Sequence, residues 1–411
     1  MTRNVMGRLL LMRRSRWFAS LCLLLISAVL ETDGALLVLQ RKELSAAWKY
    51  AVQSRIYPED PDRMFVTTRG AGLAVLNISD RDSGRPVLCA QSLLNHSLEG
   101  QDRVGNIFVV VDLDLSGLHV FDLRKGAGLA PVGFVQFGLH GALHCRLYTA
   151  PDGCLYALVT IGHHIIHTSR LAIVNVTAPD APVLVADLET AVMCMEGVLV
   201  YRGFAFVGGY CDSHSLVVIS LEDVTAPRIV RTLHNESYVN MVGALGTSPT
   251  TGTALMYQAL WARPGGLAIF DMTDPASPLE ISRVVGDKTS MANRVQINNM
   301  GYAFLPLDGG FNASGVAAID IRKPRRPALV QAVTLPATRV YCLATGSVRF
   351  VYVFAIGYPS NDTTMYTFSI NPPTQGQSTR TQALPLNIPV RSGDVKSGES
   401  ARRAASVLGA E

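Results

Sequence analysis

The 411-residue sequence is poor in charge, since only 17% of its residues are Asp, Glu, Lys or Arg and the formal net charge is +4. Part of that charge comes from arginines that precede an apolar run near the N-terminus. The rest of the chain has no basic stripe of the kind that nucleic-acid binding needs, so we expect no nucleic-acid partner. Hydrophobic residues make up 48% of the chain. A large core is therefore available, in two or three ordinary domains or in one large all-β domain.

The chain also lacks an apolar run of the usual membrane-spanning length. The run WFASLCLLLISAVL covers only residues 17–30, whereas a membrane helix needs about 20 apolar residues. A basic segment precedes this run and a small residue, Ala35, follows it, which is the pattern of a secretory signal peptide. We therefore expect residues 1–35 to be a signal peptide, with an uncleaved signal anchor as the alternative. The mature protein would be secreted or displayed at the extracellular surface, without a membrane span.

Recognised catalytic motifs are absent as well. No Ser-His-Asp or Cys-His pattern has a familiar spacing, and the glycine-rich stretches lack the lysine of a phosphate-binding loop. Helical hydrophobic periodicity is nearly absent. The sequence therefore identifies no reaction, and an enzyme is the less favoured hypothesis.

What the sequence contains is a repeat, well represented by GLAIFDMTDPASPLEISRVV at residues 266–285. Successive copies begin 45 to 53 residues apart. A period of this size with four strands per unit is typical of a β-propeller. The other copies begin at Gly72, Gly117, Arg170, Ser215, Gly315 and Thr364.

Each copy reads as two strands joined by a turn. A short apolar run is followed by a polar residue such as Asn175, whose side chain can bond the backbone of the coming turn. Two prolines, such as Pro179 and Pro182, then take the chain out of the sheet before a second apolar run. The copies supply strands C and D of each blade, and the segments between them supply strands A and B.

The sequence therefore predicts an all-β fold, a seven-bladed β-propeller of four-stranded antiparallel blades over residues 36–377. We expect residues 36–44 to close the ring as the outermost strand of blade seven. The alternative closing strand is TQALPLNIP, residues 381–389. The polar tail, residues 378–411, is expected to be disordered.

The repeats resemble those of the LVIVD-repeat β-propeller family, whose unit reads roughly G-L-x-I-x-D followed by two prolines. Residues 266–281 match this pattern best, and the resemblance covers about residues 45–372. It implies the propeller fold and an extracellular or surface-associated protein, and it supplies no shared catalytic residues. The first and second copies depart from the pattern through a longer C–D turn, and the last lacks a clear D strand.

Histidines gather in one sector of the predicted ring. If strand A is innermost, the D–A and B–C connections share the face on which propellers usually bind ligands, and six of the nine histidines map to that face in blades three and four. Imidazoles with a carboxylate suit a divalent metal such as zinc, so the alternative function is a metal-dependent hydrolase or lyase. Ordinary loop histidines are the other interpretation. The candidate metal ligands are His140, His144, His163, His164, Asp212 and His214.

The cysteines and the sequons fit a secretory protein. Cys194 and Cys211 flank a predicted turn and are expected to form a disulfide. Cys145 and Cys154 are placed too far apart along their strands for the α-carbon separation of a disulfide. The N-x-S/T sequons that predict N-glycosylation are Asn77, Asn95, Asn175, Asn235, Asn312 and Asn361.

The preferred hypothesis is a secreted or cell-surface propeller that binds a protein or a glycan through its B–C and D–A connections. Exposed aromatic and arginine side chains are common binding anchors. Glycans on that face would leave the sector of blades three and four most accessible. Fold alone does not establish this function. The residues proposed to contact the ligand are Trp261, Arg263, Asp308 and Tyr358.

Overall fold

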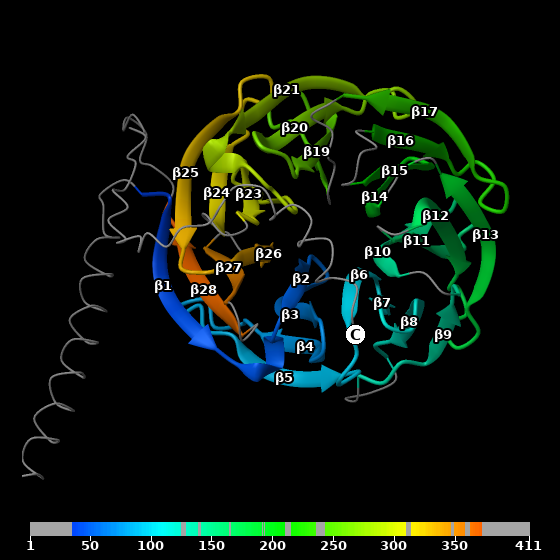
Figure 1. Ribbon diagram of the computed structural model, residues 1–411, viewed down its shortest axis with the longest axis horizontal. Helices are drawn as coiled ribbons and strands as arrows, with labels where there is room; N and C mark the ends of the chain where they lie inside the picture. Colours follow the sequence, from blue (N-terminus) through cyan, green and yellow to red (C-terminus); the bar gives the residue numbers. More distant parts are fainter. Residues whose placement is uncertain are drawn as a thin grey trace, which may run out of the picture. The chain divides into compact units, whose positions relative to one another are not determined.

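The computed structural model describes residues 35–371 except for 125–128, 139–140, 164–165, 191, 193, 210–214, 236–242, 310–313, 347–348 and 358–361. All of these described residues belong to one compact unit, Met1–Thr379. They form seven four-stranded antiparallel sheets arranged as blades around a central axis (Figure 1). The predicted seven-bladed β-propeller is therefore confirmed. The predicted tail and the alternative closing strand lie outside the described residues.

The first four blades follow one another along the chain, and in each the first strand lies nearest the axis (Figure 1). Blade one contains β2 (Ala51–Tyr57), β3 (Asp60–Thr68), β4 (Gly72–Asn77) and β5 (Val87–Ser92). Blade two contains β6 (Leu98–Val104), β7 (Ile107–Asp112), β8 (Gly117–Asp122) and β9 (Gly133–Gln136). Blade three contains β10 (Ala142–Thr149), β11 (Leu155–His163), β12 (Ile166–Asn175) and β13 (Val183–Thr190). Blade four contains β14 (Met195–Tyr201), β15 (Phe204–Gly209), β16 (Ser215–Ser220) and β17 (Arg228–His234).

The last three blades complete the ring, and blade seven takes its outermost strand from the start of the described chain. Blade five contains β18 (Ala244–Thr247), β19 (Ala254–Leu260), β20 (Gly265–Asp271) and β21 (Leu279–Gly286). Blade six contains β22 (Gln296–Ile297), β23 (Tyr302–Leu307), β24 (Ser314–Asp320) and β25 (Ala328–Leu335). Blade seven contains β26 (Arg339–Ala344), β27 (Phe350–Ile356), β28 (Thr363–Ile370) and β1 (Leu37–Leu44). Two 3-10 turns, η1 (Ala46–Trp48) and η2 (Asp287–Thr289), are the helical elements of the described chain.

The closure by β1 confirms the predicted role of residues 36–44. Strand β1 pairs antiparallel with β28, from Leu37 opposite Ile370 to Leu44 opposite Thr364. The neighbouring blade also holds β1, because the Gln331 side chain of β25 accepts a hydrogen bond from the Leu37 N–H at 2.7 Å and donates one to the Leu37 carbonyl at 3.2 Å. Strand β1 is thus held by β28 within blade seven and by Gln331 of β25 in blade six.

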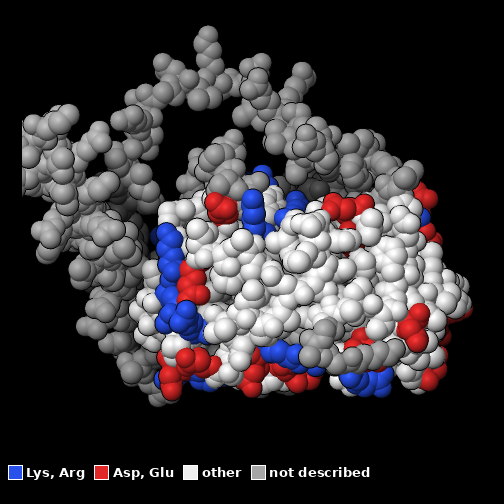
Figure 2. Space-filling view, turned by 90° about the horizontal axis from the view of Figure 1, so that it is seen from below, with Lys and Arg blue, Asp and Glu red and all other residues white. Residues whose placement is uncertain are grey.

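The core lies between neighbouring sheets, which explains why the middle strands are apolar on both faces. Between blades one and two, for example, Phe65 and Val75 pack in one cluster with Phe108, Val110 and Phe121. The outermost strands have one neighbour fewer and leave apolar side chains exposed. The middle of the side wall seen in Figure 2, around β5 and β9, is accordingly largely uncharged.

The polar residue at the end of strand C has the predicted role in the turn that follows in at least four blades. Side-chain oxygens of Asn77, Asn175, Asp271 and Asp320 accept a hydrogen bond from the backbone N–H two residues later, at 2.8, 3.0, 2.9 and 2.9 Å. This local bond begins the turn toward strand D in each of these blades.

Truncating the buried end of β1 should weaken the ring closure. Leu37 is 1% exposed and packs in the core between blades six and seven, so Leu37→Ala should lower the free energy of unfolding by about 2–5 kcal/mol. Leu44→Ala in the same strand, where the side chain is 66% exposed, is the matched control and should change it by less than about 0.5 kcal/mol. Urea denaturation measures both, and equal effects of the two changes would contradict the assigned closure.

Candidate functional site

The B–C and D–A connections share one face of the ring, as the sequence predicts. In blade one, the B–C connection after β3 contacts the D–A connection before β6, because Arg69 bridges to Ser97 and the Gly70 N–H donates to the His96 carbonyl at 3.1 Å. We call this side of the propeller the loop face. Side chains from the starts of the innermost strands and the ends of the B strands meet there.

Five of these side chains, Tyr50, Arg69, Glu99, Arg339 and Tyr341, form a group that we call the axial cluster. Arg69 is ion-paired with Glu99, and its guanidinium carbon lies 5.4 Å from the centre of the Tyr50 ring. The rings of Tyr50 and Tyr341 are 6.0 Å apart, and Arg339 donates a hydrogen bond to the Tyr341 hydroxyl. The cluster therefore joins blades one, two and seven.

The cluster offers cationic and aromatic groups in fixed positions. The Arg69 side chain is 30% exposed, whereas that of its partner Glu99 is 2% exposed. Burial acts to lower the pKa of Arg69, but the Glu99 carboxylate outweighs it and the pKa is raised. Burial also raises the pKa of Tyr341, so its hydroxyl stays protonated and can donate a hydrogen bond. Such Arg and Tyr groups are typical of binding surfaces.

Further charges line the innermost strands. Asp102 of β6 accepts from Arg55 at 2.8 Å, from Arg146 at 3.4 Å and from the Leu147 N–H at 2.8 Å, so it ties together the inner strands of blades one, two and three. Burial lowers the pKa of Arg146 to about 10, and the nearby Arg55 lowers it as well. These pairs stabilise the ring interior, where an unpaired charge would be costly.

Glu196 of β14 is the exception to this close pairing. Its nearest cation, Arg294, lies 4.0 Å away, and its side chain is 14% exposed. Burial raises the pKa of Glu196 to about 7 and Glu99 raises it too, while Arg294 lowers it. Glu196 is therefore the carboxyl group of the described interior that changes charge near neutral pH.

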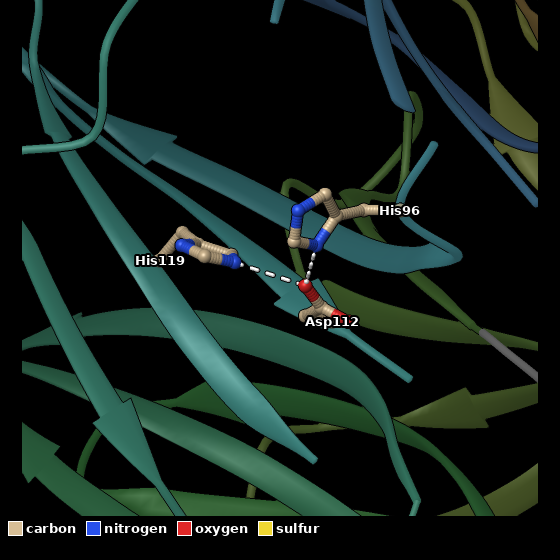
Figure 3. Close-up of side chains that lie close together, drawn as sticks. All are labelled: His96, Asp112 and His119. Carbon is tan, nitrogen blue, oxygen red and sulfur yellow. Dashed lines mark hydrogen bonds and ion pairs between the residues drawn. The ribbon is translucent and has the colours of Figure 1, made fainter. Parts of the chain in front are cut away.

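A second group on the loop face consists of His96, Asp112 and His119, from the D–A connection before β6, the end of β7 and β8. Figure 3 shows both imidazole rings directed at the same carboxylate oxygen. His96 Nδ1 is 2.6 Å and His119 Nε2 is 3.0 Å from Asp112 Oδ2, and Oδ1 accepts from the Leu115 N–H at 3.0 Å. Burial acts to raise the pKa of Asp112, but the bonds from His119, the Leu115 N–H and His96 outweigh it and the pKa is lowered.

Among the described residues, this is the one group whose ligand atoms lie close enough, within 4.8 Å of one another, to hold a metal ion. A metal on His119 Nε2 would leave the proton on Nδ1, which is buried and has no partner in the described part of the chain. Metal-bound histidines normally donate that N–H to an acceptor. The arrangement therefore fits a hydrogen-bonded clasp between the D–A connection and strands B and C better than a metal site.

Most of the predicted metal ligands cannot be compared with the structure. His140, His164, Asp212 and His214 lie outside the described residues, as does the His163 side chain, although the His163 backbone ends β11. His144 is described and fully buried in β10, where its Nδ1 accepts from the Val198 N–H of blade four at 3.4 Å. Burial lowers the pKa of His144 well below its ordinary value, so its ring is neutral.

The predicted ligand-binding residues that are described lie near the loop face in blades five and six. Arg263 follows β19, is exposed, and donates a hydrogen bond at 2.8 Å to the carbonyl of Gly309, which follows β23. Asp308 is buried beside that carbonyl, and Trp261 packs partly buried against the core between the two blades. Tyr358 lies outside the described residues. The structure therefore brings Trp261, Arg263 and Asp308 into one sector.

Cys194 is disulfide-bonded, and its partner is outside the described residues, as is Cys211, the predicted partner. Cys145 and Cys154 are both free, in agreement with the predicted lack of a bond between them. Of the sequon asparagines, Asn77 and Asn95 are exposed, whereas Asn175 and Asn235 are half-buried. Asn312 and Asn361 lie outside the described residues.

The axial cluster and the histidine clasp were not predicted from the sequence. A signal for the clasp exists, because His119 is the one histidine at its position among six repeats, where the other copies have Ala74, Ala172, Val217, Ala268 and Ala317. The axial cluster has no comparable signal, since its members come from strands that are far apart in the sequence.

Removing the charge of Asp112 should loosen the clasp. Asp112→Asn replaces two charge-assisted hydrogen bonds with weaker ones and should lower the free energy of unfolding by about 1–3 kcal/mol, whereas Asp82→Asn, at a carboxylate that is 99% exposed, should have little effect. Urea denaturation measures both changes. Zinc titration of the unchanged protein provides the second measurement, and stoichiometric zinc binding that is lost in Asp112→Asn would contradict the clasp interpretation.

Glu196 should make stability depend on pH. Between its ordinary value of 4.5 and about 7, the folded chain holds a proton that the unfolded chain has released, so this carboxyl group lowers stability as pH rises through that window. Glu196→Gln should therefore be more stable relative to the unchanged protein at pH 8 than at pH 4.5, by up to about 3 kcal/mol. Glu59→Gln, at an exposed carboxyl group, is the control variant. A stability difference for Glu196→Gln that does not change with pH would refute the assignment.

The comparisons with known proteins agree on the fold alone. The crystal structure of the WD40 β-propeller domain of Doa1 superposes with a TM-score of 0.55 and 12% sequence identity, covering 81% of this chain and 96% of that chain. No family model matches the sequence, and no curated protein does. In the described residues, no helix has the length and apolar character needed to cross a membrane. The chain is a seven-bladed β-propeller.

Proposed function

We propose that this protein is a secreted or cell-surface interaction module that binds a protein or glycan partner through its loop face. The observation that carries the proposal is the axial cluster, in which two tyrosines and two arginines from blades one and seven are linked by contacts, and Arg69 pairs with a buried carboxylate of blade two. Secretion is supported by the signal-peptide pattern of residues 1–35 and by the sequons.

The chemistry of the cluster suits either class of partner. Tyrosine buries a large area for little loss of conformational freedom, and both tyrosine and arginine are frequent anchors in protein interfaces. The same tyrosine rings can stack on a sugar while the guanidinium groups donate to its hydroxyls. Glu99 is nearly inaccessible, so a partner would meet the cations and rings rather than the carboxylate.

Trp261, Arg263 and Asp308 extend the proposed binding surface of the loop face to blades five and six. The hydrogen bond from Arg263 to Gly309 fixes an exposed guanidinium next to the B–C connection of the following blade. The resemblance to LVIVD-repeat propellers supports the same proposal, because that family implies an extracellular or surface-associated protein.

The metal-dependent hydrolase or lyase gains no specific support from the described residues. His144 is the one proposed ligand with a described side chain, and it is buried between blades three and four with its Nδ1 already accepting a hydrogen bond. We therefore keep the interaction module as the single proposed function.

Two arginines on the loop face should be needed for binding. We expect the double variant Arg263→Ala and Arg339→Ala to bind cell surfaces at least tenfold more weakly than the unchanged protein, a loss of about 1.4 kcal/mol. The control, Arg202→Ala with Arg228→Ala, removes two arginines from the other side of the blades and should bind within twofold of the unchanged protein. Saturation binding of the labelled, secreted full chain measures the affinities.

The same assay separates the two classes of partner. Prior treatment of the cells with a protease removes a protein partner, and treatment with glycosidases removes a glycan partner. Loss of binding after either treatment supports the proposal and identifies the class. Equal binding by both double variants, or the absence of saturable binding, would refute it.

A further inference from the structure

The face opposite the loop face carries a concentration of positive charge in one turn. The C–D turn of blade six, between β24 and β25, contains Arg322, Lys323, Arg325 and Arg326 within five consecutive residues. The proposed function makes no use of this turn, because partner binding is assigned to the other face.

The fold does not require these cations, since three other blades build the same turn without them. Hydrogen bonds that correspond to Arg326 N–H to the Lys323 carbonyl, at 2.8 Å, occur in blades three, four and five at 3.1 Å each. Blade two also has cations, Arg124 and Lys125, at the first two of the four positions that are cationic in blade six. Blades three, four and five have only acidic, hydroxyl or alanine side chains at all four positions. These are Thr177, Ala178, Asp180 and Ala181, then Glu222, Asp223, Thr225 and Ala226, then Thr273, Asp274, Ala276 and Ser277.

Only one of the four cations has a carboxylate partner. Arg322 donates to both oxygens of Asp320, with Nη2 2.5 Å from Oδ2 and Nε 3.0 Å from Oδ1. Lys323, Arg325 and Arg326 are exposed, and none of these three forms an ion pair with any residue in the described ranges. Three exposed cations without a close ion pair on one turn attract anions.

These cations border a pocket. A cavity of about 300 Å³ separates the turn of blade six from the A–B turn of blade five, which follows β18. The A–B turn contributes the hydroxyls of Ser248, Thr250, Thr251 and Thr253 to the lining, and the blade-six turn contributes Lys323, Arg325 and Arg326.

The one acidic side chain in the lining is already engaged. Asp271 Oδ1 accepts hydrogen bonds from the Thr273 N–H at 2.9 Å and from its hydroxyl at 2.6 Å. Asp271 keeps its negative charge: the Thr273 hydrogen bonds lower its pKa, and nearby Arg325 lowers it too. The pocket still has three cations against this one carboxylate, so its net charge is positive.

We propose that this pocket binds the sulfate or phosphate group of an anionic ligand. The guanidinium groups of Arg325 and Arg326 can each donate two parallel hydrogen bonds to such a group, and Lys323 adds a compact charge. On the opposite wall, the Thr253 hydroxyl accepts from the Thr251 hydroxyl at 2.9 Å and can donate its own proton to a remaining oxygen. A volume near 300 Å³ is at the small end of ligand sites, which suits one charged group with a short attachment.

Isothermal titration of the full chain tests the proposal with four probes: inorganic sulfate, inorganic phosphate, glucose 6-sulfate and glucose 6-phosphate. Sodium chloride keeps the ionic strength constant, so that general screening is the same in every titration. We expect saturable binding of at least one probe. A preference for the sulfate or the phosphate ester identifies which group the natural ligand carries, and either preference supports the site.

The variant Lys323→Ala, Arg325→Ala and Arg326→Ala should bind the probe at least tenfold more weakly. The matched control, Lys49→Ala, Arg228→Ala and Lys288→Ala, also removes three exposed cations and should bind within twofold of the unchanged protein. If the alanine variant fails to fold, Lys323→Asp, Arg325→Ala and Arg326→Ser places the blade-five residues in the turn and keeps the Arg322–Asp320 pair.

A substitution on the other wall of the pocket tests whether binding depends on the shape and hydrogen bonds of the pocket as well as on its charge. Thr253→Val removes a hydroxyl without changing charge and should weaken binding about threefold, whereas a bare cationic turn would not respond to it. Absence of saturable binding, an equal loss in the control, or no effect of Thr253→Val would overturn the proposal.

Discussion

The pairing of β1 with β28 is the constraint on which the rest of the molecule depends. Residues 37–44 lie beside residues 364–370 only when the ring is complete, so seven sheets are held in a circle by one strand from the start of the described chain. Closure gives every sheet a neighbour on both sides, and the middle strands can then be apolar on both faces. It also brings Tyr50 of blade one against Tyr341 of blade seven, so the axial cluster exists only because the ring is closed.

The two faces of the propeller handle charge differently. Near the axis, the partly buried cations lie beside carboxylates: Arg69 beside Glu99, and both Arg55 and Arg146 beside Asp102. Matching is needed there because burying an unpaired ion costs several kcal/mol. The blade-six turn is exposed to water, where unpaired cations cost little. The cations of that turn are therefore available to bind a ligand, whereas most of the charged residues near the axis form ion pairs that stabilise the ring.

The sequence predicted those features that are local or repeated. The blade count, the strand order, the turn at the end of strand C and the closing strand all follow from patterns within about 50 residues, and the structure shows each of them. The partners of individual side chains could not be predicted, because residues such as Arg55 and Asp102 lie in different blades and no repeated pattern relates them. The predicted histidine sector illustrates the limit. Topology placed His144 at the start of its strand, but only the packing of blade four shows that its ring is buried.

Internal repeats offer a way to separate structural from functional residues without any related sequence. A residue type that recurs at one position has a structural role common to the blades. The Asn or Asp that ends strand C is an example, because its side chain accepts a hydrogen bond from the turn that follows. A residue type that appears in a single copy has a structural or functional role specific to that blade. His119 is such a residue, and its bond to Asp112 explains it within the fold. Arg325 and Arg326 are also such residues, and neither forms an ion pair with a residue in the described part of the chain. Since the turn forms equally well without them, the reason for these cations lies in something the turn meets from outside.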